Sequence, residues 1–557
     1  MNILLISAKL QKIIHNFACV KHLSRIFGGL TLLFTLLMSL PWLVPHMGWT
    51  ALLGFVPLLV MERLASQYKV KHFWWWQYGA FVLWNAVTTW WVGEATVGGA
   101  VFAVLANALQ MAVVFGSFRW VKRRTRGVLP YLYLAAAWIA WEKYYLTLAQ
   151  ISWPWLVLGN AFADTTGLVQ WYCVLGSLGG SLWVWAANLS VFGLMVALSD
   201  GRMASWNGKA RLAAICGTSL VLFGPMVWSA CLCFQEEGRP LKVVMGQPNY
   251  DPYEKRGAVP REEQDRSFLD LLEKADWKAA EPVLALAPET FILHMYSEDL
   301  PGSGSFLRFQ DFLRRHPSTN LIFGASLYDR VYAPVAPDPC AYDLGRQADG
   351  RHLWVLAHNS AVVTDTTARI NLYHKSKLVV ATELTPYPGL FIPLQKWLLG
   401  TTLMGQDIGQ KEISCLPVLL PEGAVNVGVP ICYESVYGDF CAGYVRKGAQ
   451  LLAVITNDAW WGNTPGYRQH LSYSRLRAIE TRRWVARCAN TGVSAIIDPR
   501  GRILDRTAWW EPALLEGEVQ LLQGQTFFVR YGDIVGRTAV FLFVLLLAAA
   551  LFHARKH

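Results

Sequence analysis

Charged residues are scarce in this chain: they make up 16% of its 557 residues, against about a quarter in ordinary soluble proteins. Cysteine is also infrequent, with 10 residues in the whole chain, so the protein is not a small scaffold held by disulfides. Hydrophobic residues reach 54% and the mean hydropathy is +0.28, which excludes intrinsic disorder and argues against a wholly soluble protein. The 26 Trp residues suit a bilayer protein, because their rings settle at the boundary between lipid and water.

Long apolar runs recur along the chain. A helix needs roughly 20 apolar residues to cross the hydrocarbon core of a bilayer. We therefore expect eight membrane spans, at residues 26–44, 49–63, 72–93, 98–118, 128–149, 174–198, 211–234 and 534–553. The sequence Pro41-Trp42-Leu43 after the first run offers no small-residue cleavage site, so this run is not expected to be a cleaved signal peptide.

The positive charges are distributed unevenly. The net charge of +11 would point to nucleic acid only if the basic residues shared one soluble face. Instead, Lys and Arg gather in the first 25 residues, in the loops after the second, fourth and sixth runs, and in the tail, whereas the other loops carry almost none. Because positive loops stay on the cytoplasmic side, we expect both termini in the cytoplasm and no nucleic-acid partner.

This topology predicts four parts. They are a basic cytoplasmic N-terminus (1–25), a transmembrane bundle of seven spans (26–237), an extracytoplasmic domain (238–533), and a last span with a short basic tail (534–557). The extracytoplasmic part alternates charged amphipathic runs, such as 261–277, with strand-like apolar runs, and this alternation predicts an α/β domain. The strand-like runs lie at residues 241–246, 283–287, 320–326, 359–364, 425–430, 451–456 and 493–498.

The first candidate site residue is Glu289, which follows the apolar run 283–287. A carboxylate directly after a buried strand can be partly desolvated, which raises its pKa and suits it to accept a proton. The alternative is a structural acid in the first turn of a helix.

The second candidate segment contains Lys375 and, eight residues later, Glu383. A lysine held beside a strand can stabilise an oxyanion, and Glu383 can orient it; the alternative is an ordinary surface lysine. His374 has no second His, Asp or Cys nearby at metal-ligand spacing, so we expect no metal site there.

The third candidate is Cys432, which follows the apolar run 425–430 and precedes Tyr433 and Glu434. Backbone N–H groups at such a turn can lower the pKa of a thiol and hold an oxyanion, although an isolated cysteine is more often a small buried hydrophobe. The extracytoplasmic part has an odd number of cysteines, five, so at least one thiol stays unpaired within the chain.

With glutamate, lysine and cysteine in this order after three strands, the region 238–533 resembles the nitrilase (carbon–nitrogen hydrolase) superfamily, whose site is a Glu-Lys-Cys triad on an αββα sandwich. With the expected spans around it, the whole chain is similar to the apolipoprotein N-acyltransferases. The likeness also includes the segments Trp153-Pro154-Trp155, Thr456-Asn457-Asp458, Gln469-His470-Leu471, Ala489-Asn490-Thr491-Gly492 and Arg530-Tyr531-Gly532-Asp533. The family's common Leu-Val-Pro-Phe-Gly-Glu reads Leu-Val-Val-Ala-Thr-Glu here, ending at Glu383.

The resemblance implies a role for each residue. Glu289 matches the general base, Lys375 the residue that stabilises the oxyanion, and Cys432 the nucleophile. Supporting roles fall to Glu383, Tyr433 and Glu434, while Lys377 is out of register.

The resemblance also implies the reaction. It is transfer of the sn-1 acyl chain of a phospholipid, through a cysteine thioester, to the α-amino group of a diacylglyceryl-cysteine at the N-terminus of an apolipoprotein, in a ping-pong scheme. The expected location is the bacterial inner membrane, and this chemistry requires no cofactor or metal. Two alternatives remain: a membrane-tethered amidase that uses water as the second nucleophile, and a non-catalytic membrane scaffold with a nitrilase-like domain.

Overall fold

The structure, a computed structural model, describes residues 23–234, 237–251, 259–278, 280–400 and 405–554. Most of the basic N-terminal segment and the basic tail from residue 555 lie outside these ranges. The chain divides into two compact units. A helical unit contains the described parts of residues 1–148, 153–233 and 533–557, and an α/β unit contains those of residues 149–152 and 234–532.

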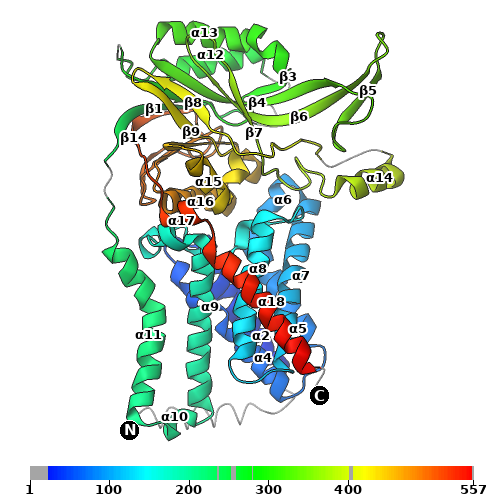
Figure 1. The fold of residues 1–557 in the computed structure, drawn as a ribbon, viewed down its shortest axis with the longest axis vertical. Helices are drawn as coiled ribbons and strands as arrows, with labels where there is room; N and C mark the ends of the chain where they lie inside the picture. The colour runs from blue at the N-terminus through cyan, green and yellow to red at the C-terminus, as the bar shows by residue number, and fades with distance from the viewer. Residues whose placement is uncertain (1–22, 235–236, 252–258, 279, 401–404, 555–557) are drawn as a thin grey trace. The chain divides into compact units, whose positions relative to one another are not determined.

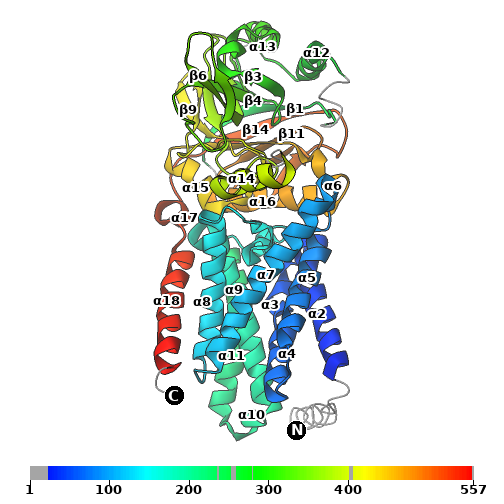
Figure 2. The same ribbon diagram turned by 90° about the vertical axis from the view of Figure 1, so that its right-hand side faces the viewer.

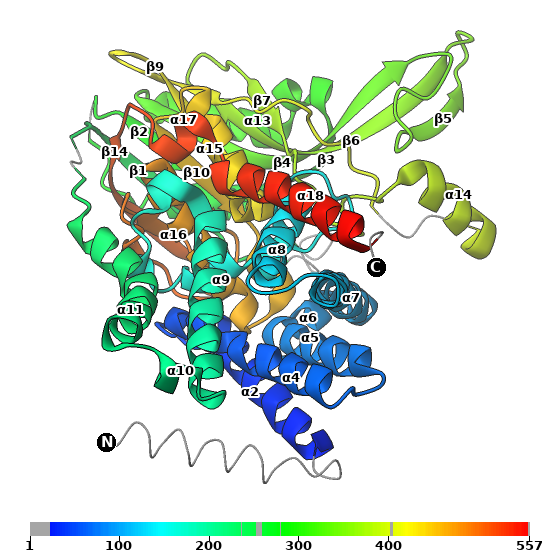
Figure 3. The ribbon, with the colours of Figure 1, turned by 60° about the horizontal axis from the view of Figure 1, so that its bottom comes forward.

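The helical unit has a helix at each of the eight expected spans (Figure 3). Its helices are α2 (Leu23–Leu43), α3 (Ala51–Gly54), α4 (Val56–Gln67), α5 (Phe73–Thr89), α6 (Val92–Ala95), α7 (Val97–Lys122), α8 (Leu129–Thr147), α9 (Tyr172–Ser199), α10 (Arg202–Ser205), α11 (Gly208–Cys231) and α18 (Ile534–Ala554). The last helix returns to the unit from the far end of the sequence, and its Phe543 ring packs 5.7 Å from the ring of Tyr133 on α8.

Among the described residues, six helical segments are long and apolar enough to cross a membrane, rather than the eight expected. They are residues 23–43, 48–67, 97–122, 172–199, 208–231 and 534–552. The two expected spans that fall short are α5, which has 17 residues, and α8, which has 19. Both are rich in Trp and Tyr, and these rings add less hydropathy than aliphatic side chains do.

In the helical unit, a buried polar side chain forms hydrogen bonds with backbone groups where a helix is interrupted. The break between α3 and α4 exposes backbone groups, and the side chain of Asn188 on α9 satisfies them. Its Oδ1 accepts from the N–H of Phe55 at 2.7 Å, and its Nδ2 donates to the carbonyl of Ala51 at 2.8 Å. Irregular backbone inside an apolar bundle needs such partners because no water is present to supply them.

Several tryptophans occupy the core of the helical unit rather than a water boundary. Trp84, Trp138 and Trp185 are fully buried and pack edge to face or tilted against Phe55, with centroids 4.4–6.3 Å apart. Aromatic rings of this size fill the space between helices and stabilise it through large buried areas.

The α/β unit contains two sheets. The first has the strand order β14-β1-β2-β4-β6-β5, with β3 paired to β4 and β7 paired to β6; the second has the order β13-β12-β11-β10-β9-β8. The strands of the first sheet are β1 (Arg239–Gln247), β2 (Val283–Leu286), β3 (Ile292–Tyr296), β4 (Thr319–Tyr332), β5 (Tyr342–Arg346), β6 (His352–Thr364), β7 (Asn371–His374) and β14 (Ala513–Leu521). Those of the second are β8 (Leu416–Leu420), β9 (Gly423–Gly428), β10 (Leu451–Thr456), β11 (Val485–Ala489), β12 (Ala495–Ile497) and β13 (Ile503–Arg506).

The layers follow from the alternation of side chains along each strand. On β2, Leu284 and Leu286 face the core between the two sheets, whereas Val283 and Ala285 face a second core under helices α12 (Arg261–Leu272) and α13 (Gly304–Arg315). Figure 1 shows α12 and α13 over the first sheet. Figure 2 shows α15 (Gly438–Arg446) and α16 (Pro465–Thr481) on the far side of the second sheet. The result is the expected αββα sandwich; helix α17 (Phe527–Tyr531) adds Phe528 and Val529 to its core, and α14 (Pro388–Leu399) is a separate helix beside the layers (Figure 1).

Candidate active site

Glu289 lies three residues after the end of β2, in a turn pressed against β4. The turn requires glycine at position 324, because a Cβ there would lie 2.6 Å from the Cα of Glu289 and 2.7 Å from the carbonyl oxygen of Pro288. The Glu289 side chain is 7% exposed. Its Oε2 accepts a hydrogen bond from the backbone N–H of Asn457 at 3.1 Å, so the second sheet helps to aim the carboxylate.

Lys375 directly follows β7 and is anchored by its backbone N–H, which donates to the carbonyl of Asn359 on β6 at 2.7 Å. Its ammonium lies 3.1 Å from Oε1 of Glu289 and 2.8 Å from Oε1 of Glu383. Burial by itself lowers the pKa of Lys375, but the charges of Glu289 and Glu383 outweigh burial and raise that pKa well above its ordinary value. The lysine therefore carries a positive charge inside the site.

Asn359 joins the two carboxylates, a role that the sequence did not predict. Its Nδ2 donates to Oε1 of Glu289 at 2.8 Å and to Oε1 of Glu383 at 2.9 Å. Glu383 also accepts from the backbone N–H of Val379 at 2.8 Å. The only sign of Asn359 in the sequence is a polar residue at the start of the apolar run 359–364.

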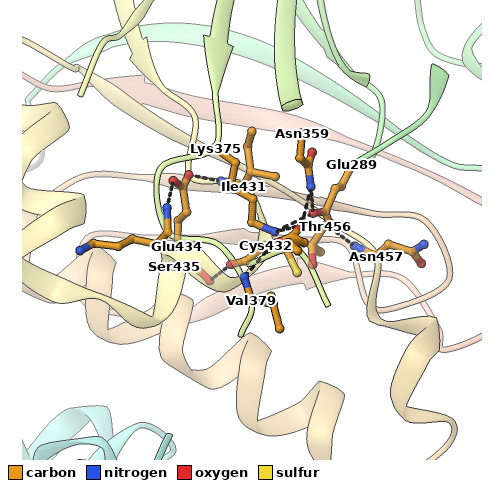
Figure 4. Close-up of polar contacts among 12 residues, drawn as sticks. Glu289, Asn359, Lys375, Val379, Ile431, Cys432, Glu434, Ser435, Thr456 and Asn457 are labelled. Atoms are coloured by element: carbon orange, nitrogen blue, oxygen red, sulfur yellow. Dashed lines mark hydrogen bonds and ion pairs between the residues drawn. The ribbon is translucent and has the colours of Figure 1, made fainter. Parts of the chain in front are cut away.

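Cys432 begins the short 3₁₀ helix η7 (Cys432–Val436) and adopts a left-handed backbone conformation, with φ of 51°. A non-glycine residue in this region is uncommon and costs free energy, and such residues cluster at functional sites. Figure 4 shows the Cys432 side chain beside Lys375 and Glu289. Burial raises the pKa of the thiol, the charge of Glu289 raises it further, and Lys375 opposes both, so the resting group is a neutral thiol.

Glu434 forms hydrogen bonds both with the backbone beside Cys432 and with the backbone beside Lys375. Its Oε2 accepts from the backbone N–H of Ile431, one residue before Cys432, at 2.8 Å. Its Oε1 accepts from the N–H of Ser376, one residue after Lys375, at 2.6 Å, and from the hydroxyl of Tyr373 at 2.7 Å. Glu434 is fully buried, and its hydrogen bonds link the backbone beside Cys432 to the backbone beside Lys375.

Tyr433 is buried and packs edge to face on Tyr437, with centroids 5.3 Å apart. The Lys377 ammonium lies 5.4 Å from the centroid of the Tyr437 ring, and the Lys377 backbone N–H donates to Oε1 of Glu434 at 3.1 Å.

A buried polar network supports the Cys432 backbone, and the sequence did not reveal its function. His470 on α16 lies 3.0 Å from the Cys432 carbonyl oxygen through Nε2 and 2.9 Å from Asp458 Oδ1 through Nδ1. Arg487 on β11 donates to Oδ2 of Asp458 at 2.7 Å. Burial raises the pKa of Asp458, but the charges and hydrogen bonds of Arg487 and His470 outweigh it and hold that pKa well below its ordinary value.

The structure thus brings Glu289, Lys375 and Cys432 together, with Glu383 and Glu434 around them. All five cysteines of the α/β unit are free. Of the described residues, one group can together offer three ligand atoms to a metal ion, and its members, Asp329, His358 and His374, are separate from this cluster.

Two family models match parts of the chain. Residues 34–190 match the apolipoprotein N-acyltransferase N-terminal domain, and residues 340–527 match the carbon-nitrogen hydrolase family. The second range contains Lys375 and Cys432, whereas Glu289 precedes it.

Whole-length relatives are also found. The chain is 30% identical to the apolipoprotein N-acyltransferase of Azotobacter vinelandii over 484 residues, covering 82% of each chain. It is 28% identical to that of Chlorobaculum tepidum over 504 residues, covering 89% of this chain and 90% of the relative. Among solved structures, Saccharomyces cerevisiae Nit3, a member of branch 10 of the nitrilase superfamily, is 14% identical, with a TM-score of 0.34 over 52% of this chain and 93% of its own.

Proposed function

Because this chain belongs to the apolipoprotein N-acyltransferase family, we propose that it moves the sn-1 acyl chain of a phospholipid to the N-terminus of a lipoprotein through a thioester on Cys432. The acceptor is the α-amino group of an N-terminal diacylglyceryl-cysteine. The observation that carries this proposal is the convergence of a carboxylate, an ammonium and a thiol from three separated segments into one buried cluster.

The first half-reaction begins with proton transfer. The raised pKa of the Cys432 thiol calls for a base, and Glu289 takes the proton. The thiolate attacks the ester carbonyl, and the oxyanion that forms is stabilised by the Lys375 ammonium and a backbone N–H near Cys432. When the intermediate collapses, the C–O bond breaks and the lysophospholipid leaves with the proton that Glu289 held.

The second half-reaction uses the same groups. The neutral α-amino group of the lipoprotein attacks the thioester, and Glu289 accepts a proton from the attacking nitrogen. The C–S bond then breaks, Cys432 recovers its proton, and the product is an N-acylated lipoprotein. Lys375 stabilises the oxyanion in both halves, which accounts for its being held by two carboxylates.

The protein is a bacterial membrane protein with several apolar helices. We further propose that residues 238–533 face the extracytoplasmic side of the inner membrane and that both termini are cytoplasmic. The alternation of Lys and Arg between loops supports this orientation, which would place the site on the side from which lipid-anchored substrates are reached.

The test is intact-protein mass spectrometry of the detergent-purified full-length chain after incubation with a phospholipid of defined acyl chains. We expect one added acyl mass that neutral hydroxylamine removes. Cys432→Ala should abolish it. The matched control is Cys441→Ala, since Cys441 is another buried thiol of the same unit, with Sγ 3.5 Å from the Glu434 carbonyl oxygen, and it should retain the adduct.

An adduct that persists in Cys432→Ala would overturn the assignment of the nucleophile. No adduct from a folded wild-type protein would favour a scaffold without catalysis. If water hydrolyses the acyl adduct but a diacylated lipopeptide does not accept the acyl group, the result would favour an amidase.

A further inference from the structure

Three strands of the first sheet bring Asp329, His358 and His374 together. Asp329 comes from β4, His358 from β6 and His374 from β7. Each offers a ligand atom, and these atoms all lie within 4.8 Å of one another. Spacing along the sequence does not predict this group, because its members are separated by other strands and meet only through strand pairing.

The strand register explains why the three share one face. Ser360 pairs with His374 and lies two residues after His358 on β6, so both histidines point to the same side of the sheet. His358 pairs with Leu327, and Asp329 lies two residues after Leu327 on β4, so Asp329 points to that side as well. Leu327 faces the core under α12 and α13. The group therefore lies on the opposite face of the sheet from Asn359 and Lys375.

The orientation of His358 directs its Nε2 at the carboxylate of Asp329. Its Nδ1 lies 2.8 Å from the carbonyl oxygen of Ile408, which can only accept, so Nδ1 carries a hydrogen. In the neutral ring, Nε2 then presents a lone pair, and it lies 3.5 Å from Oδ2 of Asp329. Two ligand atoms at about 2.1 Å from a tetrahedral zinc ion are about 3.4 Å apart, so this pair is already spaced for an ion between them.

Each of the three side chains also has a second partner that orients it. Ser297 donates to Oδ1 of Asp329 at 2.5 Å, and Ser360 Oγ lies 2.7 Å from Nδ1 of His374. The His358 and His374 rings lie side by side, with centroids 4.2 Å apart. Hydrogen-bonded outer partners of this kind are characteristic of metal ligands, because they fix ring orientation and carboxylate geometry.

We propose that Asp329, His358 and His374 form a binding site for a divalent transition-metal ion, with Zn²⁺ as the best match. Two imidazoles and one carboxylate suit zinc better than they suit calcium or magnesium, which prefer oxygen ligands. The Asp329 side chain is 35% exposed, so a fourth position can be taken by water. The assignment of this metal site does not rest on the proposed acyl transfer.

The position of this site in the sheet means that a bound ion would affect the neighbouring residues Asn359 and Lys375. His358 and His374 immediately precede Asn359 and Lys375, whose backbones are joined at 2.7 Å. An ion bound to both histidines and to Asp329 would cross-link β4, β6 and β7 on the face of the sheet opposite Asn359 and Lys375. Zn²⁺ is thus expected to stabilise the strands that position the lysine.

The experiment is metal binding by the tag-free, full-length protein in detergent after chelator treatment and desalting. We expect one equivalent of Zn²⁺ per chain by elemental analysis, a higher unfolding temperature with Zn²⁺, and a visible d–d band when Co²⁺ is used instead. His358→Gln and His374→Gln should each lose the Co²⁺ band and the rise in unfolding temperature. The matched control is His352→Gln, which alters another His–Asp pair on β6: His352 lies 2.5 Å from Asp343, and among the described residues this pair belongs to no group of three metal ligands.

Absence of stoichiometric Zn²⁺ binding in the wild type would show an ordinary His–Asp ion pair and overturn the proposal. So would a Co²⁺ band that persists in both glutamine variants. Size-exclusion elution of each variant establishes folding, and Asp329→Asn provides a third substitution at a partly exposed position.

Discussion

Asn359 Nδ2 lies 2.8 Å from Oε1 of Glu289. The same amide nitrogen lies 2.9 Å from Oε1 of Glu383, so one side chain sets the separation of two carboxylates that both face the Lys375 ammonium. Two negative charges beside one positive charge give this cluster a net negative charge, and neutral hydrogen-bond donors stabilise the carboxylates without changing that charge. Asn359 is such a donor, and we expect it to be a positioning residue for the proposed base.

We predict that Asn359→Ala slows acylation of Cys432. A hydrogen bond to a charged group contributes about 1.5–3 kcal/mol, which corresponds to about a 10- to 150-fold lower rate. The measurement is the rate of acyl-enzyme formation by mass spectrometry, together with its pH dependence, which should move because the environment of Glu289 changes. Asn426→Ala is the control, since its amide donates to the Lys447 carbonyl at an exposed position; equal rates in the two variants would count against this role.

Lys375 and Lys377 offer a paired test of charge placement. Lys375→Met removes the buried cation and leaves Glu289 and Glu383 as neighbouring carboxylates, so acylation should fall by about 10²-fold or more, as for loss of an oxyanion-stabilising group. Lys377→Met removes a cation that contacts Tyr437 and Phe440 rings instead, and the rate should change less than about threefold. A larger effect at Lys377 than at Lys375, measured as single-turnover acylation, would reverse the assignment.

Glu434→Gln should damage both stability and acylation. All the groups around the Glu434 carboxylate are donors, including the N–H groups of Ile431 and Ser376, and an amide would turn its own N–H₂ toward some of them. A buried donor without an acceptor costs about 1–3 kcal/mol. Thermal unfolding should therefore shift downward, whereas Glu422→Gln, at an exposed residue paired with Arg239, should leave it almost unchanged. A normal unfolding temperature in Glu434→Gln would refute this account.

The Asp458–Arg487 pair predicts a pH dependence of stability. Because the pKa of Asp458 is held below its ordinary value in the folded protein, its contribution is complete well above the ordinary aspartate pKa of about 3.9 and is lost as the pH falls through the lowered value. Asp458→Asn should lose about 3–5 kcal/mol at pH 7, since it leaves a buried Arg487 without its charge partner.

The difference in unfolding temperature between wild type and Asp458→Asn should narrow as the pH is lowered below 4. Asp505→Asn, at an exposed residue of β13, is the control and should show no such narrowing. A difference that stays constant from neutral to acidic pH would mean that Asp458 acts by shape rather than by charge.

Each strand that the sequence predicted contains apolar residues in succession, although the apolar strand β8 (Leu416–Leu420) was not predicted. All seven predicted runs fall on strands β1, β2, β4, β6, β9, β10 and β12. β11 was missed because Arg487 interrupts its apolar pattern; in the structure that buried charge is paired with Asp458, which lies two residues after the end of the neighbouring strand β10. β7 was missed because it has four residues, too few to show alternation.

The sequence by itself determined the division into apolar helices and an α/β domain, since both depend on hydrophobic runs that neighbouring residues define. Resemblance then identified the three residues of the candidate triad. The tertiary structure decided how they are held: Asn359, Glu434 and the Asp458–His470 pair act across strands, through side chains that no local pattern links. It likewise decided that His374, isolated in the sequence, lies beside His358 and Asp329. Strand pairing brings distant residues within hydrogen-bond distance, and that information is carried by the register of the sheet.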